Sequence, residues 1–180
     1  MNRNATLILH FLMDKILPPL LRDSRWFMSP LFRLALGPKS HHYLEFKERL
    51  PHLSEQDIQG YYTLLGDRLT RSLAKRGLQV TGADILPPSN TEDTTNPLFC
   101  KADVTQLQFQ DHAFDTVICA HTLEHVFDIE KALSEVRRVC SKRLIVVVPR
   151  QREYRYTFDL HIHFFPYAYK LSVFFGKIVV

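Results

Sequence analysis

The sequence has few cysteines, and none of them stands in a pairing pattern. Cys100, Cys119 and Cys140 are odd in number and far apart, and no C-x-x-C spacing occurs. This argues against a disulfide framework and against a zinc knuckle. Buried, reduced thiols are expected instead, as is usual for a protein of the cytoplasm.

The sequence also lacks a long apolar run and a strong charge of either sign. The apolar stretch 6–13 ends at Asp14 and Lys15, and no small-residue cleavage site follows it. Neither a membrane span nor a signal peptide is therefore expected. The net charge of +4 over 180 residues is small, and the 23 basic residues are scattered along the chain. No nucleic-acid partner is expected from it.

Residues 1–53 are rich in leucine, phenylalanine and arginine and are interrupted by prolines. Short helices are expected at 5–17, 19–28 and 30–36, because apolar residues recur there at helical spacing. A helical cap packed on the main domain is the favoured interpretation, since no long amphipathic run is present. Peripheral membrane contact through these helices, or a lid over the substrate, is the alternative.

Residues 54–180 predict a mostly parallel α/β domain. A long or once-kinked helix is expected from Glu55 to Arg76, with Ser54 as its N-cap and Gly77 just after its end. Four apolar runs bounded by polar or turn residues then predict strands: 78–85, 97–104, 114–121 and 143–149. A helix at 128–142, capped by Asp128, lies between the last two strands and predicts a right-handed parallel crossover.

Two acidic residues follow successive strands of this predicted sheet. Asp84 ends the first strand, and Asp103 ends the second. In open parallel sheets ligands bind at the carboxyl ends of the strands. A carboxylate there can accept hydrogen bonds from ribose hydroxyls or from an exocyclic amine. A turn or capping role is the alternative for either acid alone.

The pattern of residues 102–149 extends this idea. An acid is followed by "LQF", then by "FDTV", then by "LEH". With the strand that ends at Asp84, this stretch resembles the core of the class I S-adenosylmethionine-dependent methyltransferases, of the type 11-like subgroup. The resemblance implies a Rossmann-like domain, S-adenosylmethionine as the cofactor and a small-molecule or lipid-like methyl acceptor. It implies these cofactor-binding residues: Asp84 and Ile85 at the ribose, Ala102, Asp103 and Val104 at the adenine, and Ala120 with His121 near the methionine end.

The chain departs from that family in one respect. The family's first strand and its G-x-G-x-G loop should precede residues 69–77, but "YYTLLGDR" at 61–68 runs directly into that helix, and Gly66 is the one glycine there. Roughly 25–40 residues are missing by comparison. The chain also reaches Val180 before the family's last antiparallel pair would be complete. The expected sheet is therefore incomplete: strands 78–85 and 114–121 must either pair directly or leave the sheet split.

Several histidines are candidate general bases for methyl transfer. His121 and His125 are expected at i and i+4 on a helix start, and His161 or His163 is the alternative. The same residues support a rival interpretation, a histidine-based zinc site, although the spacing is not H-E-x-x-H and no metal is expected. A nicotinamide-dependent oxidoreductase would need a G-x-G-x-x-G loop. A non-catalytic binding or scaffold protein remains the other alternative.

The aromatic residues that follow the last strand are expected to shape an acceptor pocket. They are Tyr154, Tyr156, Phe158, Phe164 and Phe165. Plain core aromatics are the alternative. The expected organisation is thus an N-terminal helical cap, 1–53, and a truncated Rossmann-like methyltransferase domain, 54–180.

Overall fold

The structure is a computed structural model, and it divides the chain into two compact units. It describes residues 8, 11–49, 66–87, 96–153, 155, 156, 158 and 160–167. Unit 1 comprises Met1–Leu53 with Pro149–Val180, and unit 2 comprises Ser54–Val148. The sequence predicted that residues 149–180 belong with the α/β domain, whereas the structure groups them with the N-terminal helices. Each unit is described by itself below.

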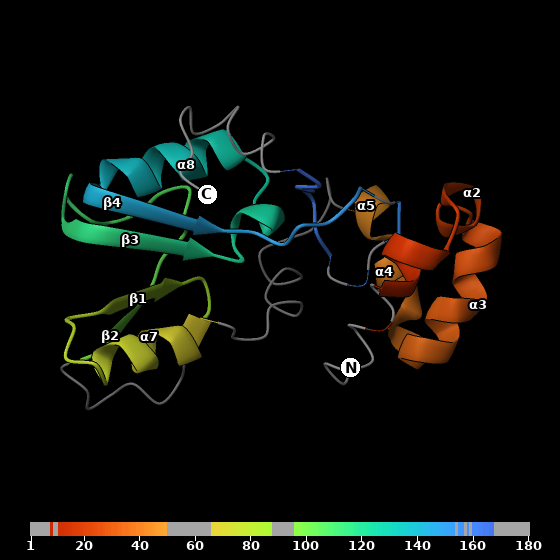
Figure 1. The fold of residues 1–180 in the computed structure, drawn as a ribbon, viewed down its shortest axis with the longest axis horizontal. Helices are drawn as coiled ribbons and strands as arrows, with labels where there is room; N and C mark the ends of the chain where they lie inside the picture. The colour runs from red at the N-terminus through yellow and green to blue at the C-terminus, as the bar shows by residue number, and fades with distance from the viewer. Residues whose placement is uncertain are drawn as a thin grey trace. The chain divides into compact units, whose positions relative to one another are not determined.

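Unit 1 is a set of short helices around a small core (Figure 1). Its elements are the π-helix η1 (Leu12–Ile16), α2 (Pro19–Arg22), α3 (Arg25–Leu36), the 3-10 helix η2 (Gly37–Lys39), α4 (Ser40–Leu44) and α5 (Phe46–Arg49). Part of the helix expected at 5–17 lies outside the described residues. Among the described residues, no helix combines the length and the apolar content that crossing a bilayer requires.

The helix α3 continues through Pro30, so the predicted break between 19–28 and 30–36 is wrong. A proline inside a helix removes one backbone hydrogen bond and crowds the preceding turn. Here Met28 and Phe32, one on each side of Pro30, are completely buried. Burial of these two side chains holds the helix together across the proline.

The core of unit 1 joins the N-terminal helices to the segment after residue 155. The buried cluster contains Met13, Met28, Phe32, Leu44, Tyr156, Phe158 and Phe164. The rings of Phe32 and Phe158 stack with centroids 3.8 Å apart and planes 14° apart. Phe165 is buried as well. Four of the five aromatics proposed for an acceptor pocket are therefore core residues, and Tyr154 lies outside the described residues.

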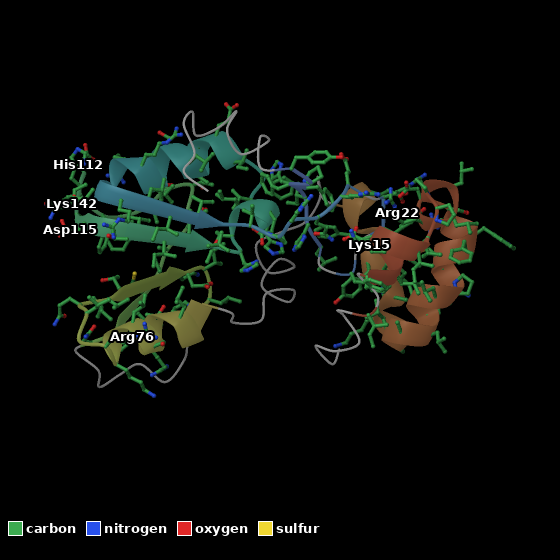
Figure 2. All side chains as sticks on the ribbon, in the orientation of Figure 1. Lys15, Arg22, Arg76, His112, Asp115 and Lys142 are labelled. Carbon is green, nitrogen blue, oxygen red and sulfur yellow. The ribbon has the colours of Figure 1, made fainter. Side chains whose placement is uncertain are left out.

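Polar contacts fasten the same segment to α2. Arg22 donates from Nη2 to the backbone oxygen of Glu153 at 3.3 Å, and it also contacts Asp23. The backbone N–H of Arg155 donates to Oδ1 of Asp23 at 3.0 Å. Figure 2 shows Arg22 among the side chains of this part of unit 1. These bonds and the aromatic core explain why residues 149–167 go with the N-terminal helices.

Unit 2 combines two small parallel sheets with flanking helices (Figure 1). Its elements are α7 (Gly66–Ala74), β1 (Thr81–Asp84), β2 (Leu98–Lys101), β3 (Phe114–Ala120), the 3-10 helix η4 (Leu123–His125), α8 (Ile129–Arg138) and β4 (Cys140–Val147). In the part of the chain that the structure describes, β1 pairs with β2 and β3 with β4. Unit 2 is therefore an incomplete α/β, Rossmann-like fold whose sheet is split, one of the two outcomes expected from the missing strand.

The end of α7 follows the prediction for Gly77. Its φ of +85° is left-handed, which favours glycine. The N–H of Gly77 donates to the oxygen of Ala74 at 2.9 Å, and that of Leu78 to the oxygen of Leu73 at 3.4 Å. These two bonds form a Schellman motif with Gly77 at C′. The predicted start of this helix, 55–65, lies outside the described residues.

The parallel pairing of β3 with β4 through an intervening helix is also as predicted. Oδ1 of Asp128 accepts a hydrogen bond from the N–H of Lys131 at 2.9 Å and so caps α8. The buried face of α8 consists of Ile129, Ala132, Leu133 and Val136. The strand β4 begins at Cys140, earlier than expected, and pairs in parallel with β3, with Ile118 opposite Ile145.

Candidate functional site

The candidate site is built on the carboxyl ends of β1 and β2. These strands are parallel neighbours, with Thr81 opposite Leu98 and Asp84 opposite Lys101. The ladder continues for one more bond, because the N–H of Ala102 donates to the oxygen of Asp84 at 2.9 Å. Asp103 follows directly. The prediction that 78–85 and 97–104 are adjacent parallel strands is thus confirmed, and both acids lie at the same end of the pair.

Each acid takes part in a local turn. Oδ1 of Asp84 accepts from the N–H of Leu86 at 2.9 Å. Oδ1 of Asp103 accepts from both the N–H and the hydroxyl of Thr105, each at 2.8 Å. A carboxylate offers about four acceptor positions, so these turns leave acceptor capacity on both side chains. The turn role and a ligand-binding role are therefore compatible, and the turns fix where each carboxylate lies.

Three apolar side chains accompany the acids. Ile85, Ala102 and Val104 are half-buried, as is Asp84, while Asp103 is exposed. Apolar groups beside exposed acceptors suit a ligand with a flat ring and polar edges, such as an adenosyl group. The structure thus brings five of the predicted cofactor residues to one edge.

Close packing beneath this edge supports β1. A Cβ atom added at Gly82 would lie 2.7 Å from Cδ1 of Phe99 and 3.1 Å from Cγ2 of Thr70. The guanidinium of Arg71 lies over the Phe99 ring, 5.2 Å from its centroid. The helix α7 therefore covers β1 and β2, and the absence of a side chain at Gly82 lets the Phe99 ring approach the backbone of β1.

The remaining predicted residues lie at the end of the second sheet. Ala120 is the last residue of β3 and is half-buried. His121 follows with a φ of +53°, which is uncommon for a residue other than glycine. Its N–H donates to the oxygen of Val147 at 2.8 Å, so the bend is tied to β4. Its side chain is half exposed.

The predicted i, i+4 arrangement of His121 and His125 on one helix is wrong. His121 precedes the helical turn in a left-handed conformation, and η4 (Leu123–His125) is a single 3-10 turn. A turn with three residues per repeat has no i, i+4 face. His161 and His163 belong to unit 1, where Nδ1 of the buried His161 contacts Oε1 of Gln151.

One residue of this segment was missed by the sequence analysis. Oε1 of Glu124 lies 3.3 Å from Nδ1 of His121, and the glutamate is fully buried. The i, i+3 spacing within "HTLEH" was the available signal.

Burial raises the pKa of the neighbouring Cys119 to about 11, so its thiol stays protonated near neutral pH. Cys119 is therefore a packing residue and not a nucleophile.

A hydrogen-bond network around Arg138 holds the loop that leads from Asp103 to β3. Arg138 donates to both carboxylate oxygens of Glu135 at 2.7 and 2.8 Å, and to Oδ1 of Asp111 at 2.8 Å. It also donates to the backbone oxygens of Leu107 and Phe109 at 2.9 and 2.8 Å. The pKa of Glu135 is lowered, first by its hydrogen bond from Arg138. The loop is thereby clamped to α8.

Comparison with known proteins identifies the domain to which this geometry belongs. Residues 65–148 match a family described as a methyltransferase domain, and this range runs from the start of α7 to the end of β4. This part of the chain belongs to the class I S-adenosylmethionine-dependent methyltransferase family. A stretch of 49 residues is 47% identical to the protein of Methanocaldococcus jannaschii named uncharacterized protein MJ0638. That stretch covers 26% of this chain and 21% of the other protein, so the similarity spans about a fifth of that relative.

Proposed function

We propose that this methyltransferase domain binds S-adenosylmethionine at the carboxyl ends of β1 and β2. Asp84 would accept hydrogen bonds from the ribose hydroxyls, with Ile85 beside it. Asp103 would accept from the adenine amine, with Ala102 and Val104 against the ring. The observation that carries the proposal is the parallel pairing of two adjacent strands that end in these acids.

The expected affinity is low. Two charge-assisted sites contribute about 1.5–3 kcal/mol each, or roughly 3–6 kcal/mol together if they add. Micromolar binding needs about 8 kcal/mol. A glycine-rich loop would bring backbone N–H groups to the cofactor, and the sequence has no such loop ahead of α7. The proposed dissociation constant is therefore near millimolar.

For a bound cofactor, the sulfonium supplies the methyl group, and the chain positions the acceptor and removes its proton. His121 is the proposed base. Glu124 lies against Nδ1 of His121 and favours a proton on that nitrogen, which leaves Nε2 as the acceptor. His125 is the second candidate. The proposed acceptor is a small or lipid-like molecule.

A second candidate function is that of a non-catalytic binding protein that keeps the methyltransferase fold. The split between the β1–β2 and β3–β4 sheets favours it, because an undivided sheet would carry both acids and His121 on one edge. The two functions differ in one measurable way: a methyltransferase transfers labelled methyl groups to an acceptor, with transfer lost in His121→Ala, and a binding protein transfers none.

Calorimetric titration of S-adenosylmethionine tests the proposed site. Asp84→Asn and Asp103→Asn are suitable variants, because asparagine keeps the Oδ1 acceptor of each turn and removes only the charge. The control is Asp115→Asn. Asp115 is exposed, pairs with Lys142 at 3.0 Å and is the second residue of β3, at the opposite end from Ala120 (Figure 2).

We expect a dissociation constant near millimolar for the wild type and for Asp115→Asn. Each site variant should bind S-adenosylmethionine at least about tenfold more weakly, because about 1.5–3 kcal/mol is assigned to the charge-assisted hydrogen bonds of each acid. Micromolar binding by the wild type would refute the weakened site. Equal binding by all four proteins would refute the assignment to Asp84 and Asp103.

A further inference from the structure

The outward face of α3 carries large apolar side chains that the fold does not bury. Trp26, Pro30, Arg33 and Leu34 stand at i, i+4, i+7 and i+8, and this spacing puts them on one side of the helix. Trp26 is 82% exposed and Leu34 is 86% exposed. The opposite side of α3 already fills the core of unit 1 through Met28 and Phe32. The side chains of the outward face therefore take no part in the core packing of this unit.

The elements that precede α3 in the chain also expose large apolar side chains. Leu20 of α2 is 88% exposed, and the chain passes from α2 to α3 through only two residues. Phe11 and Ile16, at the two ends of η1, are 60% and 59% exposed. Exposed apolar patches of this kind mark interaction sites. Tryptophan and leucine next to basic residues are the side chains that enter the interfacial layer of a membrane.

The charge of this part of the chain is complementary to an anionic surface. Residues 1–49 contain eight of the 23 basic residues and four of the 19 acidic ones, so they carry the whole net charge of +4, and the rest of the chain is neutral. Lys15, Arg33 and Lys39 are exposed. Nearby acids already face arginines: Glu45 contacts Arg25 at 3.5 Å. The basic excess thus belongs to the same part of the chain as the apolar face, and Arg33 stands on that face itself.

We propose that unit 1 docks on membranes rich in anionic lipid, with Trp26, Leu34 and Leu20 inserted at the interface and Arg33, Lys15 and Lys39 against the headgroups. A second copy of the chain fits less well, because two faces with the same excess of positive charge would meet. An anionic bilayer satisfies both the apolar and the basic components.

The single tryptophan makes the proposal directly measurable. The full chain is mixed with vesicles of phosphatidylcholine alone, or of phosphatidylcholine with about one third phosphatidylserine. We expect a blue shift of Trp26 fluorescence, and quenching by bromine-labelled acyl chains, with the anionic vesicles and much less with the neutral ones. Sedimentation of the protein with the vesicles gives the partition constant.

Matched variants separate the apolar from the charged contribution. Arg33→Glu should lower the partition constant for anionic vesicles by more than tenfold, because it changes the charge by two units and each unit contributes about fivefold. The control Arg76→Glu makes the same charge change on an exposed residue of unit 2 (Figure 2) and should weaken it less than threefold. Leu34→Ser should reduce both binding and the blue shift, and Leu78→Ser, at a 52% exposed site of unit 2, should leave them unchanged.

Three results would overturn the proposal. The first is the absence of binding to anionic vesicles. The second is an equal loss of vesicle binding in Arg33→Glu and Arg76→Glu, or in Leu34→Ser and Leu78→Ser. The third is a wild-type dimer in sedimentation velocity that Leu34→Ser converts to a monomer, because the face would then be covered by a second copy.

Discussion

The packing beneath the candidate site makes Gly82→Ala an informative perturbation. The new Cβ would lie 2.7 and 2.8 Å from two atoms of the Phe99 ring, and 3.1 Å from a methyl group of Thr70. Carbon atoms pack at about 3.5 Å or more, so the ring must move by about 0.8 Å. That movement also disturbs the stacking of Arg71 on Phe99 and the β1–β2 pair that carries Asp84.

The expected cost follows from two opposing terms. Overpacking a fitted site costs about 1–3 kcal/mol. Replacing glycine by alanine in a strand raises the unfolding free energy by about 0.5–1 kcal/mol, because the unfolded chain has less conformational entropy. The net loss of unfolding free energy should therefore be roughly 0.5–2 kcal/mol. Urea denaturation, followed by circular dichroism, measures it.

A double-mutant cycle with Phe99→Leu tests the cause. A smaller side chain at position 99 removes the ring atoms that the new Cβ would meet, so Gly82→Ala should cost nothing in that background or should stabilise. The reasoning is refuted if Gly82→Ala is as stable as the wild type, or if it costs the same with phenylalanine and with leucine at position 99.

The other predictions concern packing and hydrogen bonding away from the site. Arg138→Met removes the three hydrogen bonds from Arg138 to Leu107, Phe109 and Asp111 that clamp the 105–112 loop, so amide exchange in this loop should accelerate; unchanged exchange would contradict the clamp. Phe32→Ala should lower the unfolding free energy by about 3–5 kcal/mol, because the ring is fully buried and stacks on Phe158, and a loss under 1 kcal/mol in urea denaturation would argue against that core. Cys119, with its pKa raised to about 11 by burial, has about one thiolate per thousand molecules at pH 8. Mass spectrometry after iodoacetamide treatment should find it unmodified in the native protein and modified in urea; equal labelling would contradict the burial.

Features that depend on a few neighbouring residues were predictable from the sequence. The end of α7 at Gly77 and the cap of α8 at Asp128 both rest on bonds that reach over only three to five residues. The parallel pairing that places Asp84 and Asp103 at one edge joins residues 17 apart, and it was predictable because each strand is marked by its own apolar run and the rule for strand ends does the rest. These signals are local, so the sequence carries them directly.

Features that depend on distant contacts were not predictable. Pro30 stays within α3 because Met28 and Phe32 are buried against residues beyond 155. The same contacts assign residues 149–167 to unit 1. The left-handed bend at His121 is tied to β4 by its bond to Val147, which lies 26 residues further along the chain. Helical periodicity alone carried no sign of that bond.

The most direct test of the candidate site follows the backbone amides of the full chain by NMR during titration with S-adenosylhomocysteine to millimolar concentration. The account predicts saturable shifts at Ile85, Ala102, Asp103 and Val104, which shrink several-fold at the same ligand concentration in Asp84→Asn and keep their size in Asp115→Asn. Shifts that are absent at those amides in the wild type, or that keep their full size in Asp84→Asn, would contradict the claim that the two strand ends hold one adenosyl group.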